Sequence, residues 1–145
     1  MIRNIFNTGS IPALEQILHF TSEQHKAIVN NIANFDTPGY KAIDAPEAEF
    51  NELLIKAMEE QSSSVSGVFN FEGSNRIKPK AGGGLEVEFL NSLDSGIMTH
   101  AENNVNIDKE MGKLTKNAMM HNFAATLIAH QFNMLHEAIS ERVTG

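Results

Sequence analysis

Six histidines are the residues in this sequence best suited to metal binding or proton transfer. They are His19, His25, His100, His121, His130 and His136. No two of them lie three or four residues apart, the spacing that places two zinc ligands on one helix face. The sequence therefore predicts no metal site. His25 and His121 are expected instead to face each other where two helices pack.

One further group has a spacing that suits chemistry. Glu15, His19 and Glu23 recur every four residues, so they share one face of a helix and could exchange a proton. No nucleophile accompanies them, and a solvated polar face is the simpler interpretation. The chain has no cysteine, which excludes thiol catalysis and zinc–thiolate sites. We therefore expect no catalytic residue, no cofactor and no enzymatic activity.

The net charge of −7 is confined to the middle of the chain. Residues 36–106 carry twelve acidic and five basic residues, whereas residues 1–35 and 107–145 are each neutral. An acidic segment of this kind disfavours nucleic acid and anionic lipid as partners. The first ten residues contain one base, Arg3, and no long apolar run, so we expect no cleaved signal peptide.

The first helix is expected to begin after Ser10, because Pro12 suits the first turn of a helix, and to end near Asn34. Pro38 and Gly39 then have the composition of the centre of a type II turn. Apolar spacing of three and four predicts a heptad seam along this helix. Its members are Ile11, Leu14, Leu18, Thr21, His25, Ile28 and Ile32.

The last helix is expected to run from a cap at Asn106 or Asp108 to about Arg142. It carries a longer seam, which contains one polar member, His121. The seam comprises Ile107, Met111, Leu114, Ala118, His121, Ala125, Ile128, Phe132, Leu135 and Ile139. Two such seams in one chain predict that the terminal helices pair as an antiparallel coiled coil.

A second apolar stripe follows the same helix two residues away from the first, which is about 200° around the helix. Its members are Met120, Phe123, Leu127, His130 and Met134. One intrachain partner covers one face only, so the second stripe predicts packing against other subunits. The alternative is a central helix in a monomeric bundle. The remaining helical candidate, Glu47–Glu60, is too short to supply that cover.

Between the terminal helices the sequence predicts a short third helix and an irregular, partly β region. Val68–Phe71 and Leu85–Phe89 are strand candidates, and the glycines at 82–84 suit a turn. The expected fold is thus mainly α. It forms one structural domain with three segments, namely an N-terminal helix at 1–35, a middle segment at 36–106 and a C-terminal helix at 107–145.

One run of twelve residues links the first helix to the predicted turn. It comprises Asn30, Asn31, Ile32, Ala33, Asn34, Phe35, Asp36, Thr37, Pro38, Gly39, Tyr40 and Lys41. This run resembles the N-terminal signature of flagellar rod, hook and hook-associated proteins. A second run, from Asn103 to Met111, resembles the entry of that family into its C-terminal helix, although Asn106 stands where aspartate is usual. The short chain and its C-terminal helix are most similar to proximal-rod members of the B type.

The resemblance implies a structural subunit that passes through the flagellar export apparatus and assembles in many copies in the periplasm. It implies contacts with other rod proteins, the membrane-ring protein and the adaptor of that ring. The shaft so formed joins the membrane ring to the distal rod and hook. The alternative from another class is a soluble helical-hairpin chaperone or adaptor that buries its second stripe on one client.

Overall fold

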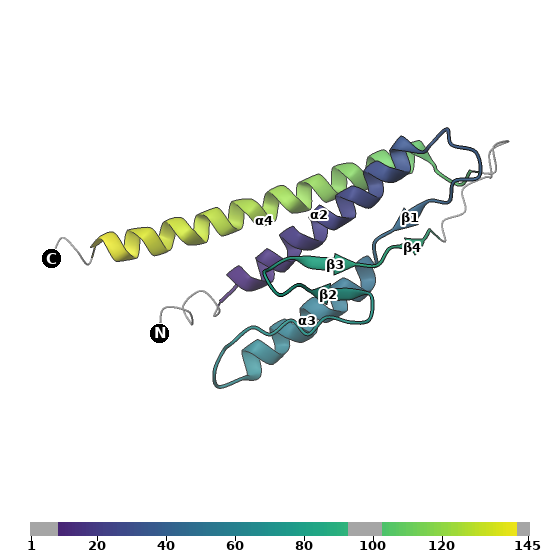
Figure 1. The fold of residues 1–145 in the computed structure, drawn as a ribbon. Helices are drawn as coiled ribbons and strands as arrows, with labels where there is room; N and C mark the ends of the chain where they lie inside the picture. Colours follow the sequence, from purple (N-terminus) through teal and green to yellow (C-terminus); the bar gives the residue numbers. More distant parts are fainter. Residues whose placement is uncertain (1–8, 93–102, 142–145) are drawn as a thin grey trace.

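Three helices lie along one long axis in the computed structural model, which describes residues 9–92 and 103–141 (Figure 1). The helices are α2 (Ile11–Ala33), α3 (Glu47–Ser63) and α4 (Ile107–Glu141). Four short strands, β1 (Ile43–Asp44), β2 (Ile77–Pro79), β3 (Leu85–Val87) and β4 (Leu90–Asn91), lie between them in sequence. The mainly α fold with a partly β middle is confirmed.

The helix boundaries follow from local chemistry. Pro12 lies in the first turn of α2, as predicted, but the Ser10 side chain forms no cap hydrogen bond. Asn106 caps α4, because its Oδ1 accepts a hydrogen bond of 3.1 Å from the backbone N–H of Lys109. Of the two predicted caps, the structure therefore selects Asn106. Arg142, where α4 was expected to end, lies outside the described residues.

The strands form two small antiparallel pairs. Ile43 and Asp44 pair with Asn91 and Leu90, whereas β2 and β3 form a hairpin whose turn contains the predicted glycines. The strand predicted at Val68–Phe71 is wrong. Its backbone is assigned to no strand ladder, but the alternating side chains of Phe69 and Phe71 are buried. Burial against the core thus places Phe69 and Phe71 without a strand ladder.

The main apolar core lies between α2, α3 and the β2–β3 hairpin. Its buried members are Ala13, Phe20, Phe50, Ala57, Phe69, Phe71, Ile77 and Leu85. The rings of Phe20 and Phe50 are stacked, with centroids 4.1 Å apart. None of these residues belongs to α4. Within the described subunit the helix packed on two sides is therefore α2, not the C-terminal helix.

Helix α4 packs antiparallel along α2 through small and polar contacts. Thr21 of α2 contacts His121 of α4, and Asn31 of α2 contacts Glu110 of α4. Residue numbers therefore increase along α2 in the direction in which they decrease along α4. The packing of the terminal helices is confirmed. A coiled coil stays a prediction, because the buried contacts include amide, hydroxyl and carboxylate groups in place of a continuous apolar seam.

The predicted seam of α4 is only partly turned toward α2. Leu114, His121, Ile128 and Leu135 are half-buried, whereas Met111, Phe132 and Ile139 are exposed, as are the small residues Ala118 and Ala125. The most buried positions of α4 are Glu110, Asn117 and Ala124, each one residue before a predicted seam member. The reason is that polar partners on α2 draw Glu110 and Asn117 inward, so that Met111 and Ala118, one residue later, lie outside the contact.

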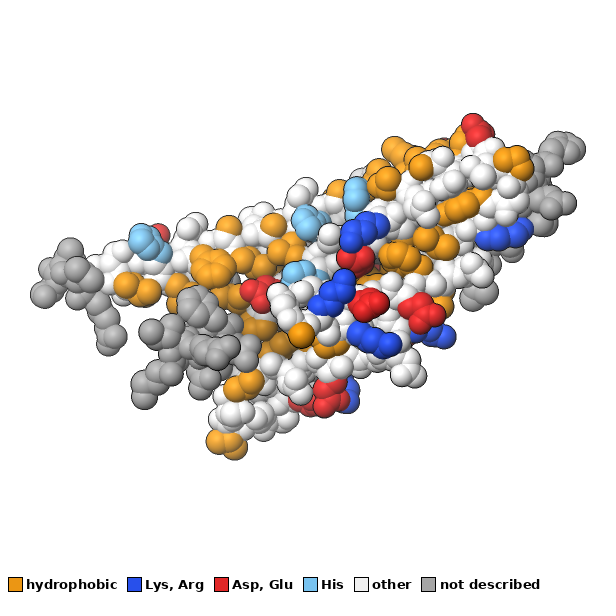
Figure 2. Space-filling view, viewed as in Figure 1, with side chains coloured by type: hydrophobic (Ala, Val, Ile, Leu, Met, Phe, Trp, Pro, Cys, Tyr) orange, Lys and Arg blue, Asp and Glu red, His pale blue; other side chains and the backbone are white. Residues whose placement is uncertain are grey.

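Hydrophobic side chains remain spread over the surface of the elongated molecule, with acidic and basic groups concentrated near the middle of the face in Figure 2. Met120, Phe123 and Met134 of the predicted second stripe are exposed, and Leu127 is half-buried. None of the helices within 9–92 and 103–141 combines the length and the apolar run needed to cross a membrane.

Gly39 provides a direct test of the turn that follows α2. Its φ of 71° and the hydrogen bond from Tyr40 N to Thr37 O, 3.3 Å long, are those of a type II turn. An added Cβ would meet no atom within 4 Å, so a side chain is opposed by backbone conformation alone. Gly39→Val should lower the free energy of unfolding by about 1 to 2 kcal/mol in denaturant titrations.

Gly82→Val is the matched control, because Gly82 also faces open space but does not have a positive φ. Equal stabilities for the two variants would contradict the conformational role of Gly39.

Candidate functional site

The two sequence runs singled out above meet at one end of the molecule, where α2 ends and α4 begins. We call this region the junction and define it by Asn31, Tyr40, Asn103 and Glu110. Asn31 and Asn103 have 0% and 1% of their surface exposed. Buried amides require hydrogen-bond partners, so the contacts of these two side chains determine the geometry of the site.

Asn31 links three segments of the chain. Its Nδ2 donates to the backbone oxygen of Ile43 (2.7 Å) and to Glu110 Oε2 (3.0 Å). Its Oδ1 accepts from the backbone N–H of Ile43 (2.9 Å) and from the hydroxyl of Tyr40 (3.0 Å). Both amide hydrogens and both acceptor positions are therefore used. The side chain acts like one more residue in the β1 ladder while holding α4 against α2.

Asn103 closes the end of α2. Its Nδ2 lies 2.9 Å from each of three backbone oxygens, those of Asn34, Phe35 and Thr37. These carbonyls belong to the helix end and the following turn, where backbone acceptors have no helical partner. Its Oδ1 accepts from the N–H of Val105 (2.8 Å), which fixes the approach to α4. Asn104 adds a contact, since its Oδ1 accepts from the N–H of Ala42 (2.7 Å).

The other motif residues build the turn itself. Asn34 Nδ2 donates to the backbone oxygen of Asn30 (2.8 Å), and Thr37 Oγ1 donates to Asn34 Oδ1 (3.2 Å). Asn30 also donates to the Tyr40 hydroxyl, at 3.2 Å. The predicted return of Tyr40 to the helix terminus is confirmed. Ala33 and Pro38 are exposed, and Ile32 is half-buried.

Charges at the junction are paired. Lys113 Nζ lies 2.6 Å from Asp44 Oδ1 and 2.9 Å from Glu110 Oε1. Burial alone would lower the pKa of Lys113, but the hydrogen bonds to Asp44 and Glu110 outweigh it and raise the pKa. Burial, followed by the nearby charge of Glu110, raises the pKa of the Tyr40 hydroxyl. The junction thus favours a charged lysine and a neutral phenol.

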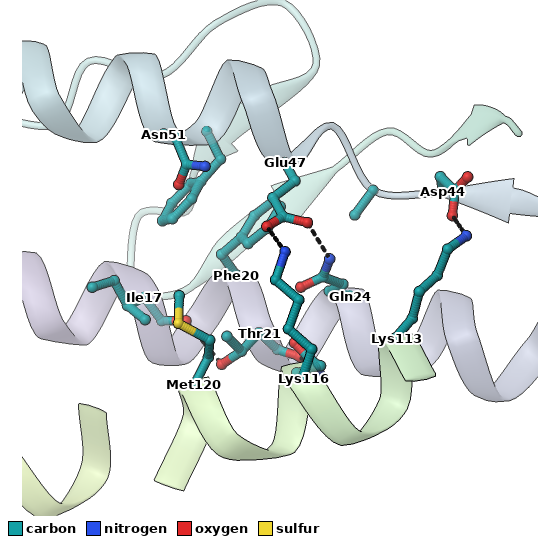
Figure 3. A pocket seen from close by; sticks show the side chains of 13 residues that line it. Ile17, Phe20, Thr21, Gln24, Asp44, Glu47, Asn51, Lys113, Lys116 and Met120 are labelled. Carbon is teal, nitrogen blue, oxygen red and sulfur yellow. Dashed lines mark hydrogen bonds and ion pairs between the residues drawn. The ribbon is translucent and has the colours of Figure 1, made fainter. Parts of the chain in front are cut away.

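A cavity of about 280 Å³ lies next to the junction, between α2, α3 and α4. Figure 3 shows two lysines of α4 reaching across it, Lys113 to Asp44 and Lys116 to Glu47. Lys116 Nζ is 2.6 Å from Glu47 Oε1, and Gln24 donates to the other oxygen of Glu47 at 3.3 Å. These ion pairs join α4 to the β1–α3 segment. The arrangement is suited to holding helices together.

The histidines do not form a cluster. His25 and His121 line one cavity of about 320 Å³ between α2 and α4, and His121 Nδ1 is 2.9 Å from Thr21 Oγ1. No group of three potential metal ligands occurs at residues 9–92 or 103–141. Glu23 is paired with Lys26 at 2.6 Å, and Glu15 is exposed. His100 lies outside the described residues.

Sequence reasoning missed Glu110 and the capping role of Asn103. An acidic residue in the first turn of a helix is normally solvated, so the sequence gives no sign that Glu110 is buried. One sequence feature points to the role of Asn103. Asn103 and Asn104 are adjacent, and the earlier run from Asn30 to Lys41 contains three more asparagines. Buried amides often bind backbone groups that are distant in sequence.

Comparison with known proteins identifies relatives over nearly the whole chain. The flagellar basal body rod protein FlgB of Borrelia hermsii is 31% identical over 138 residues, which cover 94% of this chain and 98% of the relative. FlgB of Bacillus subtilis (strain 168) is 29% identical over a match that covers 92% of this chain and 95% of the relative. FlgB of Aquifex aeolicus (strain VF5) is 26% identical over a match that covers 88% of this chain and 90% of the relative. No protein-family profile matches the chain.

The capping role of Asn103 is testable in the purified subunit. Asn103→Ala removes the donor shared by three backbone oxygens and should lower the free energy of unfolding by about 2 to 4 kcal/mol. The control is Asn70→Ala at an exposed position in the middle segment. Denaturant unfolding measures both variants. If Asn103→Ala lowers the free energy of unfolding no more than the control does, water replaces the amide without loss of stability and the capping role is contradicted.

Tyr40 is the single tyrosine of the chain, so its ionisation can be followed by ultraviolet absorbance. We expect a pKa above 10.0 in the folded subunit. Glu110→Gln should lower it only in part, because burial is the larger cause. Glu52→Gln, on the exposed surface of α3, should leave it unchanged.

The raised pKa also predicts the pH dependence of stability. An unfolded tyrosine loses its proton first, so the contribution of the neutral phenol is complete below about pH 10 and is lost as the pH rises through the folded-state pKa. A Tyr40 titration that is identical in folded and denatured protein would contradict the buried geometry of the junction.

Proposed function

The chain belongs to the FlgB family of flagellar basal body rod proteins, and we propose that it serves as a structural subunit of the proximal rod. Many copies would assemble with other rod proteins into the shaft that joins the membrane ring to the distal rod and hook. The observation that carries this proposal is a match to rod proteins over about nine tenths of both chains.

The exposed side of α4 supports assembly through helix contacts. Met119, Met120 and Phe123 are 68%, 44% and 64% exposed, within little more than one helical turn. A soluble subunit gains nothing from this exposure, whereas burial of one such side chain in a neighbouring subunit contributes about 1.5 to 3 kcal/mol. We propose that this side, together with Leu127 and Met134 of the predicted second stripe, packs against other axial subunits.

The finer assignments extend the same proposal. The subunit would leave the cell interior through the flagellar export apparatus without a cleaved signal peptide and would assemble in the periplasm. Its neighbours would be the other rod proteins together with the membrane-ring protein and its adaptor. The acidic middle segment argues against a nucleic-acid partner.

A role other than catalysis is supported by the cavity of about 280 Å³ between α2, α3 and α4. The described charged groups that line it form ion pairs that join α4 to β1 and α3, and stacked phenylalanines form part of its wall. No observation favours the chaperone or adaptor alternative, since the three relatives given above are all named as rod proteins.

The proposal is tested by purifying basal bodies from a strain that lacks the gene, complemented with wild-type or Phe123→Asp protein. We expect wild-type protein in the basal bodies and no rod in the uncomplemented strain. Phe123→Asp should be expressed and folded but absent from basal bodies, because burying an unpaired carboxylate at a subunit contact is unfavourable.

Asn70→Asp, which adds the same charge at an exposed position in the middle segment, is the control and should be incorporated normally. Intact rods in the deletion strain would refute the structural role. Normal incorporation of Phe123→Asp would refute this side of α4 as the contact.

A further inference from the structure

Gly112 occupies a position of α4 that no contact within residues 9–92 and 103–141 reserves for glycine. It lies on the exposed side of the second helical turn, and an added Cβ would meet no atom within 4 Å. Its φ is not in the left-handed region. Glycine is the least favourable residue in a helix apart from proline. Alanine would therefore favour the helix at this position, and close approach of another molecule would account for the glycine.

The surface beside Gly112 is hollowed and apolar. A shallow depression that is mostly open to solvent lies along α4, and we call it the hollow. It is lined by Gly112, Thr115, Lys116, Met119, Met120, Asn122 and Phe123. Thr115 and Met119 are each two residues from the buried Asn117, so they point away from α2. The absence of a side chain at residue 112 leaves room for the backbone of a crossing helix. Met119 and Phe123 provide the apolar surface that such a helix would bury.

Helix α3 presents a ridge that matches this hollow. Ile55 and Met58 are 56% and 48% exposed and lie three residues apart, so they share one side of α3. The opposite side holds the buried Phe50 and Ala57, which face the core. Exposed Glu52 and Glu59 stand one turn before and after Ile55. The ridge is thus apolar at its centre and acidic at its ends.

We propose that the ridge of α3 from a second copy of this chain docks into the hollow of α4, with closest approach at Gly112. Ile55 and Met58 of the incoming copy would cover Met119 and Phe123. The acidic ends of the ridge suit the hollow in charge, because Lys116 on its rim keeps 64% of its side chain exposed while paired with Glu47. The hollow and the ridge are both present on every subunit.

This inference rests on the proposed function and specifies one of its contacts. The hollow and the ridge lie on different helices, so the contact joins two unlike surfaces. In a row of subunits, the subunit at one end therefore keeps a free hollow and the subunit at the other end keeps a free ridge. Repetition of the contact builds an open helical array when the rotation between neighbouring subunits does not close a ring. A contact between two identical surfaces would stop at a dimer.

The chain contains no cysteine, so introduced thiols report this contact without background. A subunit carrying both Ile55→Cys and Gly112→Cys, incorporated into basal bodies and treated with a short thiol-specific crosslinker, should give a ladder of dimers, trimers and larger species. Ile55→Cys with Gly82→Cys, at a turn glycine in open space, should remain monomeric. Dimers from Gly112→Cys alone would mean that two α4 helices meet, and would overturn the proposal. Incorporation without crosslinking would overturn it as well.

A steric series at residue 112 provides a second measurement. Gly112→Ala should raise the melting temperature of the free subunit, and Gly112→Leu should remain folded but fall at least tenfold in basal-body occupancy. A residue needed only for folding cannot produce these opposite effects. Wild-type occupancy of Gly112→Leu would refute the docking site alone, whereas absence of the wild-type protein from basal bodies would refute the rod assignment itself.

Discussion

Two buried asparagine amides hold the end of α2 against the start of α4, and the remaining geometry of the subunit depends on them. Asn103 binds three carbonyls of the cap and turn that follow α2, and Asn31 joins the β1 backbone to Glu110. Both amides lie out of contact with water, so removing either partner leaves polar groups that water cannot readily reach. The junction therefore fixes the angle and register at which the terminal helices meet.

This arrangement gives α2 and α4 different tasks. Helix α2 packs on two sides, against the apolar core formed with α3 and the hairpin and against the polar contacts of α4. Helix α4 uses its inner side for those polar contacts and leaves Met119 and Phe123 exposed. The polar contacts fix the position of α4 on α2 more than they stabilise the fold, because amide and carboxylate groups form their hydrogen bonds only when the partners are aligned. The apolar outer side then remains for association between subunits.

Much of the site could be predicted from residue order alone. The helix end, the turn at Pro38–Gly39 and the return of Tyr40 follow from local conformational preferences and from one motif. The partners of that motif could not be predicted. Asn31 meets Glu110 across 79 residues, and Asn103 meets Thr37 across 66. Nothing in the spacing of apolar residues distinguishes a buried glutamate from a solvated one in the first turn of a helix.

The sequence by itself determined the three helices, the turn after α2, the acidic middle and the family, because each depends on neighbouring residues or on a contiguous motif. Only the tertiary structure decided which side of α4 faces inward. Heptad spacing predicted Met111, Ala118 and Ala125, yet Glu110, Asn117 and Ala124 are buried. The physical reason is that a buried amide or carboxylate must reach its partner, and that requirement rotates a helix away from the side that apolar spacing alone would bury.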